Sequence, residues 1–386
     1  MTITHDTMTV ETVLEAVRQL APSIFDRANE IEARRRLPLD LVDELRAAGC
    51  FRLVRPATHG GLEASISDAM RALESLARAD ASVAWTVMIG AGSWIDLANL
   101  PRETFDELYS NKPDAVTAGV FNPSGAITPV DGGYRVTGRW SFASGCEHAD
   151  VIFGNAVEGI VDGMPQLRGA VFAPGEVTIE DTWSVSGLCG TGSHHIHVDD
   201  IVVPAARTYV PMGGEPCIDA LIVRLPPPTV FSLVLAGVAL GIAQGALDDI
   251  TVLASDKLPL LSPVTLGGNP LFQFELATAD TELRAARSLV YEEAGRVWAT
   301  VAAGDSLTME QRARGRASAV WAVDRATSVV TSAYRAGGGS SLYSDCPLQR
   351  RLRDIYALGQ HFIIRRDTLV TAGAILAGQD VQLMVF

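Results

Sequence analysis

Two short segments of the chain carry residue types that could do chemistry. The first reads WSFASGCEHAD from Trp140 to Asp150, so an apolar strand pattern ends in Ser144 and Gly145. A hydroxyl beside a glycine would let a flat ligand approach the backbone closely. The second holds His361, and an imidazole with the ordinary pKa of about 6.5 could exchange a proton near neutral pH. From the residues alone, a strand ending in a turn and a structural helix histidine remain open.

The other glycine and histidine clusters favour no further chemistry. Gly187-Leu-Cys-Gly190-Thr-Gly192 neither follows a strand nor opens a helix, as a dinucleotide fingerprint would. His195 and His197 would share a strand face with Asp199. We interpret them as a solvated strand face, because no second ligand cluster accompanies them. The sequence therefore predicts no metal site.

Composition bounds the partners and the compartment. The 386 residues carry 31 Lys and Arg against 45 Asp and Glu, a net charge of −14. Such a chain has no general basic field for nucleic acid or an anionic membrane. The five cysteines form no CxxC pair, and no secretory signal pattern is present, so we expect a cytoplasmic protein. The apolar run from Thr229 to Ala243 is predicted to be a buried helix, not a membrane span.

The elements that must position these residues fall into three groups. Helical periodicity fills the first hundred residues, short β-rich runs follow, and long helical patterns return at 229–255, 269–303, 308–336 and 348–377. Because strands and helices are segregated, we predict an α+β, mostly α fold. The expected domains are an N-terminal helical domain (1–113), a central β-barrel or sheet domain of six to eight strands (114–225) and a C-terminal four-helix bundle (226–386).

This order of elements resembles the acyl-CoA dehydrogenase superfamily of flavoproteins over residues 10–380. The similarity rests on Gly60-Gly61 after Arg55-Pro56, on WSFASG, on GTGSHHIHVDDIVVP, on LAGVALGIAQGALDDI, on the glycines after Ala336 and on CPLQRRLRD. It implies a flavin held between the β domain and the bundle, usually in a homotetramer. The cofactor-binding residues that it implies are Trp140, Phe142, Ser144, Gly337, Gly338 and Gly339.

The branch of the superfamily depends on the catalytic base. Dehydrogenases place a glutamate at one of two positions to remove a proton beside the thioester, and here both positions are phenylalanine, Phe362 and Phe231. His361 stands beside the first, as in the two-component flavin-dependent monooxygenases. Trp85 also matches that branch, and so does the pattern at Trp183, Gly187, Gly190, Thr191, Gly192 and Ser193. One departure is Ser93, where several hydroxylases carry a second histidine.

The resemblance therefore implies the oxygenase component of a two-component monooxygenase. Reduced FAD or FMN would come from a separate reductase and react with O2 through a C4a-peroxide on a small apolar or aromatic substrate. His361 and Ser144 would be catalytic, and Trp85, Phe231 and Phe362 would line the substrate pocket. Two alternatives stay open at this point. One is an acyl-CoA dehydrogenase or oxidase with a relocated base, and the other is a binding paralogue that has lost its flavin.

Overall fold

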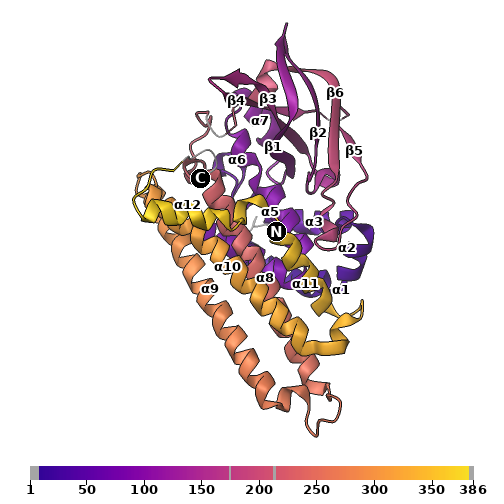
Figure 1. Ribbon diagram of the computed structural model, residues 1–386. Helices are drawn as coiled ribbons and strands as arrows, with labels where there is room; N and C mark the ends of the chain where they lie inside the picture. Colours follow the sequence, from indigo (N-terminus) through magenta and orange to yellow (C-terminus); the bar gives the residue numbers. More distant parts are fainter. Residues whose placement is uncertain (1–7, 174, 212–213, 382–386) are drawn as a thin grey trace, which may run out of the picture.

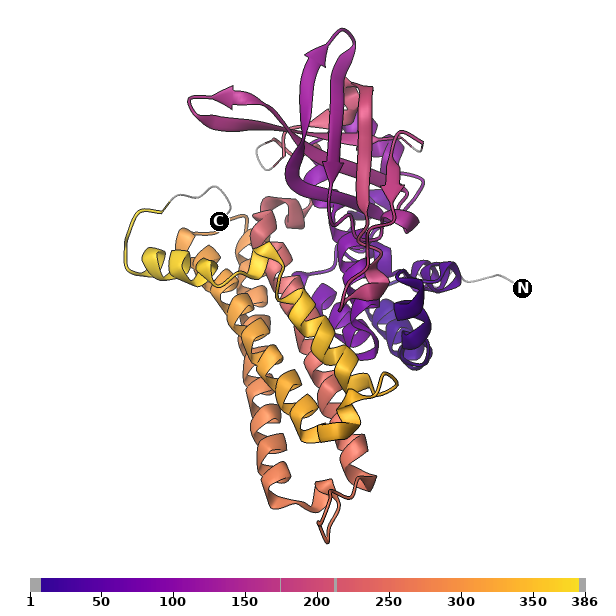
Figure 2. The same cartoon turned by 45° about the vertical axis from the view of Figure 1, so that its right-hand side comes forward.

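The computed structural model describes residues 8–173, 175–211 and 214–381. A sheet stands at one end of the molecule, a long helical bundle extends from the other, and a group of shorter helices lies beside their junction (Figures 1 and 2). This confirms the predicted fold class and the order helices, sheet, helices. The N-terminal helices are α1 (Val10–Asp26), α2 (Ala28–Arg34), α3 (Leu39–Ala47), α4 (Ile66–Ala79), α5 (Ala81–Gly92), α6 (Trp94–Leu97) and α7 (Arg102–Tyr109).

The helical periodicity of the first hundred residues does not show that α4 and α5 are separate helices. Asp80 ends α4 and caps α5, because its side chain accepts hydrogen bonds from the backbone N–H groups of Ser82 and Val83. The cap turns the chain and starts α5 afresh. In Figure 1, α5 then lies centrally, between the sheet and the bundle.

The middle of the chain forms one seven-stranded sheet in the order β5-β6-β2-β1-β3-β4-β7. Its strands are β1 (Thr117–Val130), β2 (Gly133–Trp140), β3 (Val151–Val161), β4 (Met164–Phe172), β5 (Thr178–Glu180), β6 (His195–Pro204) and β7 (Thr208–Tyr209). Val130 pairs with Gly133 across the turn at Asp131-Gly132, a residue pair that favours a tight hairpin. Among the described residues the strand pairings run from β5 to β7 without joining these two edges, so the element is a curled sheet and the barrel alternative does not describe it.

The C-terminal bundle contains α8 (Pro227–Asp256), α9 (Pro270–Ala302), α10 (Met309–Gly337), α11 (Pro347–Leu358) and α12 (Asp367–Leu376). The segment expected as one helix over 348–377 is broken. Helix α11 ends at Leu358, a 3-10 turn occupies Phe362–Ile364, and α12 lies across the end of the bundle (Figure 1). His361 sits in the break.

Helix α8 is the central helix of the protein. It is long and apolar enough to cross a membrane by composition, but 94% of its most apolar window is buried within the protein. One hydrophobic core joins α8 to the N-terminal helices, to α9, α10 and α11, and to one side of the sheet through residues such as Phe153 and Tyr209. The sheet has a separate core around Trp140. The apolar character of α8 is therefore accounted for by packing.

Candidate active site

Four polar side chains form a buried chain of hydrogen bonds where β2 ends. The indole Nε1 of Trp85 on α5 donates to the Ser144 hydroxyl (3.1 Å), which lies 2.7 Å from the Ser193 hydroxyl. Ser193 in turn lies 2.7 Å from the Thr191 hydroxyl, which donates to the Leu188 carbonyl (2.8 Å). All four side chains are buried. We call the hydroxyls of Ser144, Ser193 and Thr191 the hydroxyl relay.

The loop that carries Thr191 and Ser193 is fixed by its backbone. Leu188 adopts a left-handed conformation (φ 53°), which is strained for a side chain of this size. Its N–H donates to Asp354 Oδ1 on α11 (2.7 Å), and the N–H of Gly190 donates to the Ser82 hydroxyl on α5 (3.1 Å). A Cβ on Gly187 would stand 2.2 Å from the carbonyl oxygen of Arg353. The loop is therefore held between α5 and α11.

Asp354 carries a perturbed carboxyl group. The pKa of this group is raised to about 7, chiefly by burial and in addition by the negative charge of the neighbouring Asp80. Burial also raises the pKa of Asp80. A protonated Asp354 can still accept the Leu188 N–H bond through one oxygen. Asp354 therefore holds a proton up to near neutral pH, directly behind the loop of the relay.

His361 lies on the other side of Trp85. The two rings meet edge to face with centroids 5.5 Å apart, and the ring of Phe362 lies 4.9 Å from that of His361. Nδ1 of His361 accepts the N–H of Ile363 (3.4 Å), so a neutral imidazole carries its proton on Nε2. Trp85 thus brings together Ser144 and His361, which are 217 residues apart in the chain (361 − 144).

The protonation expected for His361 needs a correction. Burial lowers its pKa to about 4, because the charged imidazolium loses its hydration there. The predicted proton exchange near neutral pH does not fit this surrounding. The surrounding fits a neutral imidazole that donates a hydrogen bond from Nε2.

The two aromatic residues of the WSFASG segment have different surroundings. The ring of Phe142 is 67% exposed and its backbone is left-handed (φ 71°), which is a genuine outlier for an aromatic residue. It lies edge to face with Trp183, at 6.1 Å between centroids. Trp140 has no exposed surface, and its Nε1 donates to the carbonyl of Asn155 (2.6 Å). Of the two, only Phe142 presents a surface to a ligand.

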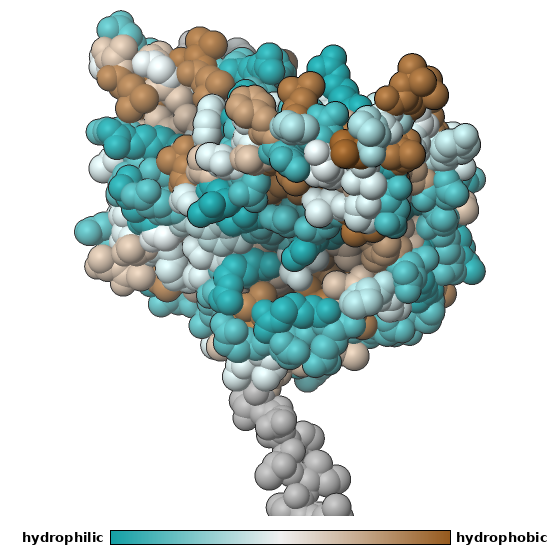
Figure 3. Space-filling view, turned by 90° about the horizontal axis from the view of Figure 1, so that it is seen from below, coloured by the Kyte–Doolittle hydropathy of each residue, from teal (hydrophilic) through white to brown (hydrophobic). Residues whose placement is uncertain are grey.

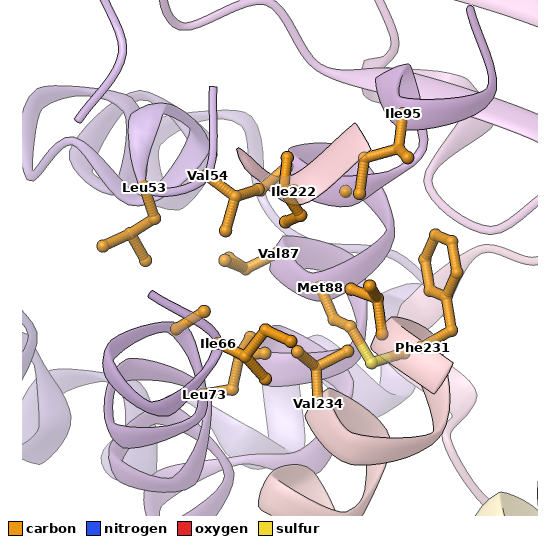
Figure 4. Close-up of a pocket in the computed structure, with 14 residues that line it drawn as sticks. Leu53, Val54, Ile66, Leu73, Val87, Met88, Ile95, Ile222, Phe231 and Val234 are labelled. Carbon is orange, nitrogen blue, oxygen red and sulfur yellow. The ribbon is translucent and has the colours of Figure 1, made fainter. Parts of the chain in front are cut away.

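An apolar cavity of about 30 Å³ lies behind Phe231, between α4, α5 and the start of α8. By the roughly 10–15 Å³ that one water requires, it would hold about two. Figure 4 shows Met88, Phe231 and Val234 on one side of it, with Leu53 and Val54 facing them. The ring of Phe231 also lies 5.6 Å from that of Phe121 on β1. Phe231 therefore separates this cavity from the sheet, while Phe362, 50% exposed, lies beside His361.

The predicted glycines lie where α10 ends, beside α8 and α11. Gly337 ends α10, and a Cβ there would contact Leu253 in the last turn of α8. It would also contact Leu348 at the start of α11, six residues and about 9 Å along that helix from Asp354, which holds the relay loop. Lys257 donates to the Gly337 carbonyl and to the Ser340 hydroxyl. Within one chain, Gly337, Gly338 and Gly339 are therefore linked to the relay loop indirectly, through α11.

The arrangement fits a flat heteroaromatic ligand such as a flavin ring. Phe142 offers an exposed aromatic face, and Ser144 offers a hydroxyl oxygen beside it. The prediction from sequence singled out Trp85, Ser144 and His361. It assigned no role to Thr191, Ser193, Asp80 or Asp354. The signal for the first two was the pair of hydroxyls in GTGS, whereas the two carboxylates meet only in the folded chain.

Comparison with known proteins places this arrangement in a family. Residues 7–99 match the N-terminal domain of acyl-CoA dehydrogenase, and residues 233–366 match its C-terminal domain. The chain is 35% identical to indole-3-acetate monooxygenase of Pseudomonas putida, over 96% of this chain and 93% of that one. It is 31% identical to the oxygenase subunit HsaA of a flavin-dependent monooxygenase of Mycobacterium tuberculosis, over 90% of each.

Solved structures of relatives have the same fold as this chain. The HsaA monooxygenase of M. tuberculosis superposes with a TM-score of 0.89 at 28% identity, over 97% of this chain and 99% of that one. XiaF from Streptomyces, solved with FADH2 and glycerol, has a TM-score of 0.90 at 25% identity, over 96% of each. Each of these four matches covers at least 90% of this chain. The chain therefore belongs to the acyl-CoA dehydrogenase family, in its branch of flavin-dependent monooxygenases.

Proposed function

We propose that this chain is the oxygenase component of a two-component monooxygenase that acts on a small, largely apolar aromatic substrate. The observation that carries the proposal is the position of Trp85, which holds the Ser144 hydroxyl at its Nε1 and the His361 ring against its edge. Phenylalanine occupies both positions where a dehydrogenase would carry its glutamate, Phe231 and Phe362. The site thus has hydrogen-bonding groups beside a flavin and no carboxylate at either base position.

Each residue has a role that follows from its surroundings. Reduced flavin, when bound, supplies the electron pair that activates O2. Ser144 would bind the flavin near N5, and Phe142 would cover the ring. His361 would donate a hydrogen bond from neutral Nε2 without releasing a proton to the pocket, because its pKa is lowered to about 4. Phe231 and Phe362 would exclude water from the reacting atoms.

The cofactor and partners follow from the same proposal. We propose reduced FAD or FMN, delivered by a separate flavin reductase, because no nicotinamide-binding fingerprint is present in the sequence. A homotetramer would allow Gly337–Gly339 of one subunit to reach the flavin of another, since in their own chain they are linked to the relay loop indirectly, through α11. Trp140 would then support the flavin site from within the sheet. We also propose a cytoplasmic location and keep the domain boundaries 1–113, 114–225 and 226–386 as a prediction.

The substrate class rests on the pocket and on the relatives. The cavity behind Phe231 is lined by apolar side chains of α4, α5 and α8, so a small ring could enter if Phe231 turns. The substrate that the name of the relative from P. putida gives, indole-3-acetate, is an indole ring with an N–H group and a carboxylate side chain. We propose a substrate of this kind, with the ring held by Phe231 and Phe362.

The decisive experiment follows the flavin itself. The purified protein is mixed anaerobically with reduced FAD, and in a second series with reduced FMN, and is then mixed with O2. We expect a delay before the absorbance of oxidised flavin returns. His361→Ala should shorten that delay at least tenfold, since removal of one preorganised donor typically costs this much or more.

The matched control is His197→Ala, a histidine removed from β6 without touching Trp85 or the relay. It should leave the delay unchanged. Immediate return of oxidised flavin in the wild type would contradict the proposal. Loss of flavin absorbance on adding an acyl-CoA thioester would establish the dehydrogenase alternative instead.

A further inference from the structure

The hydroxyl relay has only one possible arrangement of its protons. Three oxygen–oxygen contacts of 2.7–2.8 Å join Leu188 O, Thr191, Ser193 and Ser144 in a row. Contacts this short need a proton in each, because two oxygens without one would repel. The three hydroxyls supply three protons, and the carbonyl supplies none. Every proton is therefore used, one in each contact.

The carbonyl end sets the direction of the row. Only the Thr191 proton can fill the contact with Leu188 O, so Ser193 must donate to Thr191. Ser144 must then donate to Ser193. On its other side, Ser144 accepts the indole N–H of Trp85, which can only donate. The Ser144 oxygen is left with one lone pair and no proton.

We propose that Ser193 and Thr191 are specificity-determining residues that leave Ser144 able only to accept a hydrogen bond from the ligand, so that the site selects reduced over oxidised flavin. This rests on the proposed function. In reduced flavin, N5 carries a hydrogen and can donate to Ser144. In oxidised flavin, N5 has a lone pair only, so the two lone pairs would face each other.

The geometry also explains why the relay is anchored so firmly. Its direction depends on the Leu188 carbonyl, which lies in the strained loop that Asp354 holds by the Leu188 N–H. If the carbonyl turned away, the Thr191 proton could turn toward Ser193 and the row could reverse. Ser144 would then have a proton to donate, and oxidised flavin would bind as well as reduced flavin.

The test measures binding of both redox forms. Dissociation constants of reduced FMN (anaerobically) and oxidised FMN are determined by quenching of protein fluorescence, without substrate or O2. In the wild type we expect reduced FMN to bind at least about tenfold more tightly, the worth of one hydrogen bond. This equals a rise of about 30 mV in the potential of the bound two-electron couple, which gives an independent readout.

Three variants separate proton direction from simple damage. Ser193→Ala frees the Ser144 proton to turn to the ligand and should lower the preference about tenfold, mainly by tightening oxidised FMN. Thr191→Val should lower it in the same direction, because Ser193 can then donate to Ser144. Thr191→Ser keeps the hydroxyl and should keep the wild-type preference. Ser232→Ala, which removes a buried hydroxyl bonded to its own helix on α8, is the matched control.

The possible outcomes distinguish failure of the proposed function from failure of this inference. If the wild type binds neither form of FMN or FAD, the proposed function fails together with this inference. If both forms bind but Ser193→Ala and Thr191→Val leave the ratio unchanged, the relay does not set the preference, and the oxygenase proposal stands without it. An aromatic substrate could also bring the N–H donor. Indole alone is therefore titrated as a probe, and a response of indole binding but not of the FMN ratio to Ser193→Ala would overturn the flavin assignment.

Discussion

At the scale of single residues, the structure changes the chemistry expected of His361. A histidine beside a predicted active site suggests an acid–base group near neutral pH. Burial against Trp85 and Phe362 instead keeps the imidazole neutral. The sequence could identify the residue through the motif around it. It could not give the pKa, which depends on side chains from α5 and from the break between α11 and α12.

The low pKa of His361 predicts a pH-dependent stability. Its pKa is about 4 when folded and about 6.5 when unfolded. Below about pH 6.5 the unfolded chain takes up a proton that the folded chain does not. The free energy of unfolding should therefore fall by up to about 3 kcal/mol between pH 6.5 and 4, and this loss should be absent in His361→Asn. Urea denaturation at pH 7 and 4.5 measures it, with His197→Asn as control. Equal losses in wild type and His361→Asn would contradict the prediction.

At the scale of elements, α11 connects the two halves of the site. It ends just before His361, and its Asp354 holds the loop that carries the relay. Helical periodicity predicted a continuous helix over 348–377. It could not show the break at Gly359-Gln360, because glycine is tolerated inside helices and the break depends on what His361 packs against. The sheet turn at Asp131-Gly132 was predictable, since its signal is local.

Asp354 should make the wild type less stable as pH rises. Its folded pKa of about 7 lies above the ordinary pKa of an aspartate, about 3.8, so between these pH values the folded chain holds a proton that the unfolded chain has lost. The stability supplied by that proton declines through this window, by up to about 4 kcal/mol. Asp354→Asn keeps an acceptor for Leu188 and cannot ionise. Its melting temperature relative to wild type should therefore rise between pH 5 and pH 8. Parallel melting curves at the two pH values would refute this.

At the scale of the whole molecule, the predicted domains differ in how separate their cores are. The N-terminal helices and the bundle share one core across α4 and α8, which also includes Val151, Phe153, Val171 and Tyr209 of the sheet, whereas a second core around Trp140 belongs to the sheet. Periodicity predicted the elements on both sides, but it could not show which faces meet.

Seen from below, the molecule is largely hydrophilic with separate apolar groups (Figure 3). Leu260 and Leu261, in the connection between α8 and α9, are among the exposed apolar residues.

The shared core predicts that α4 and α8 unfold together. Met70 on α4 is fully buried and packs against Gly237 on α8. Met70→Ala should lower the protection of backbone amides in both helices by the same amount, about 2–5 kcal/mol. Hydrogen exchange followed by mass spectrometry measures this. Phe172→Ala, in the separate core of the sheet, is the control and should affect chiefly the sheet. A loss confined to α4 would show that the two helices open independently.

The hydroxyl relay and the apolar cavity lie on different parts of the fold, and this separation bears on how new activities could arise. The relay lies on the sheet domain and its loop, while the apolar cavity is lined by helices, of which α5 reaches the relay through Trp85. Variation at Leu73, Met88 and Val234, which line the cavity, should therefore change which molecules are accepted and leave the handling of oxygen intact. A library restricted to these three positions would explore substrate range without repeatedly destroying the catalyst. A lineage of such enzymes could diversify along the same route.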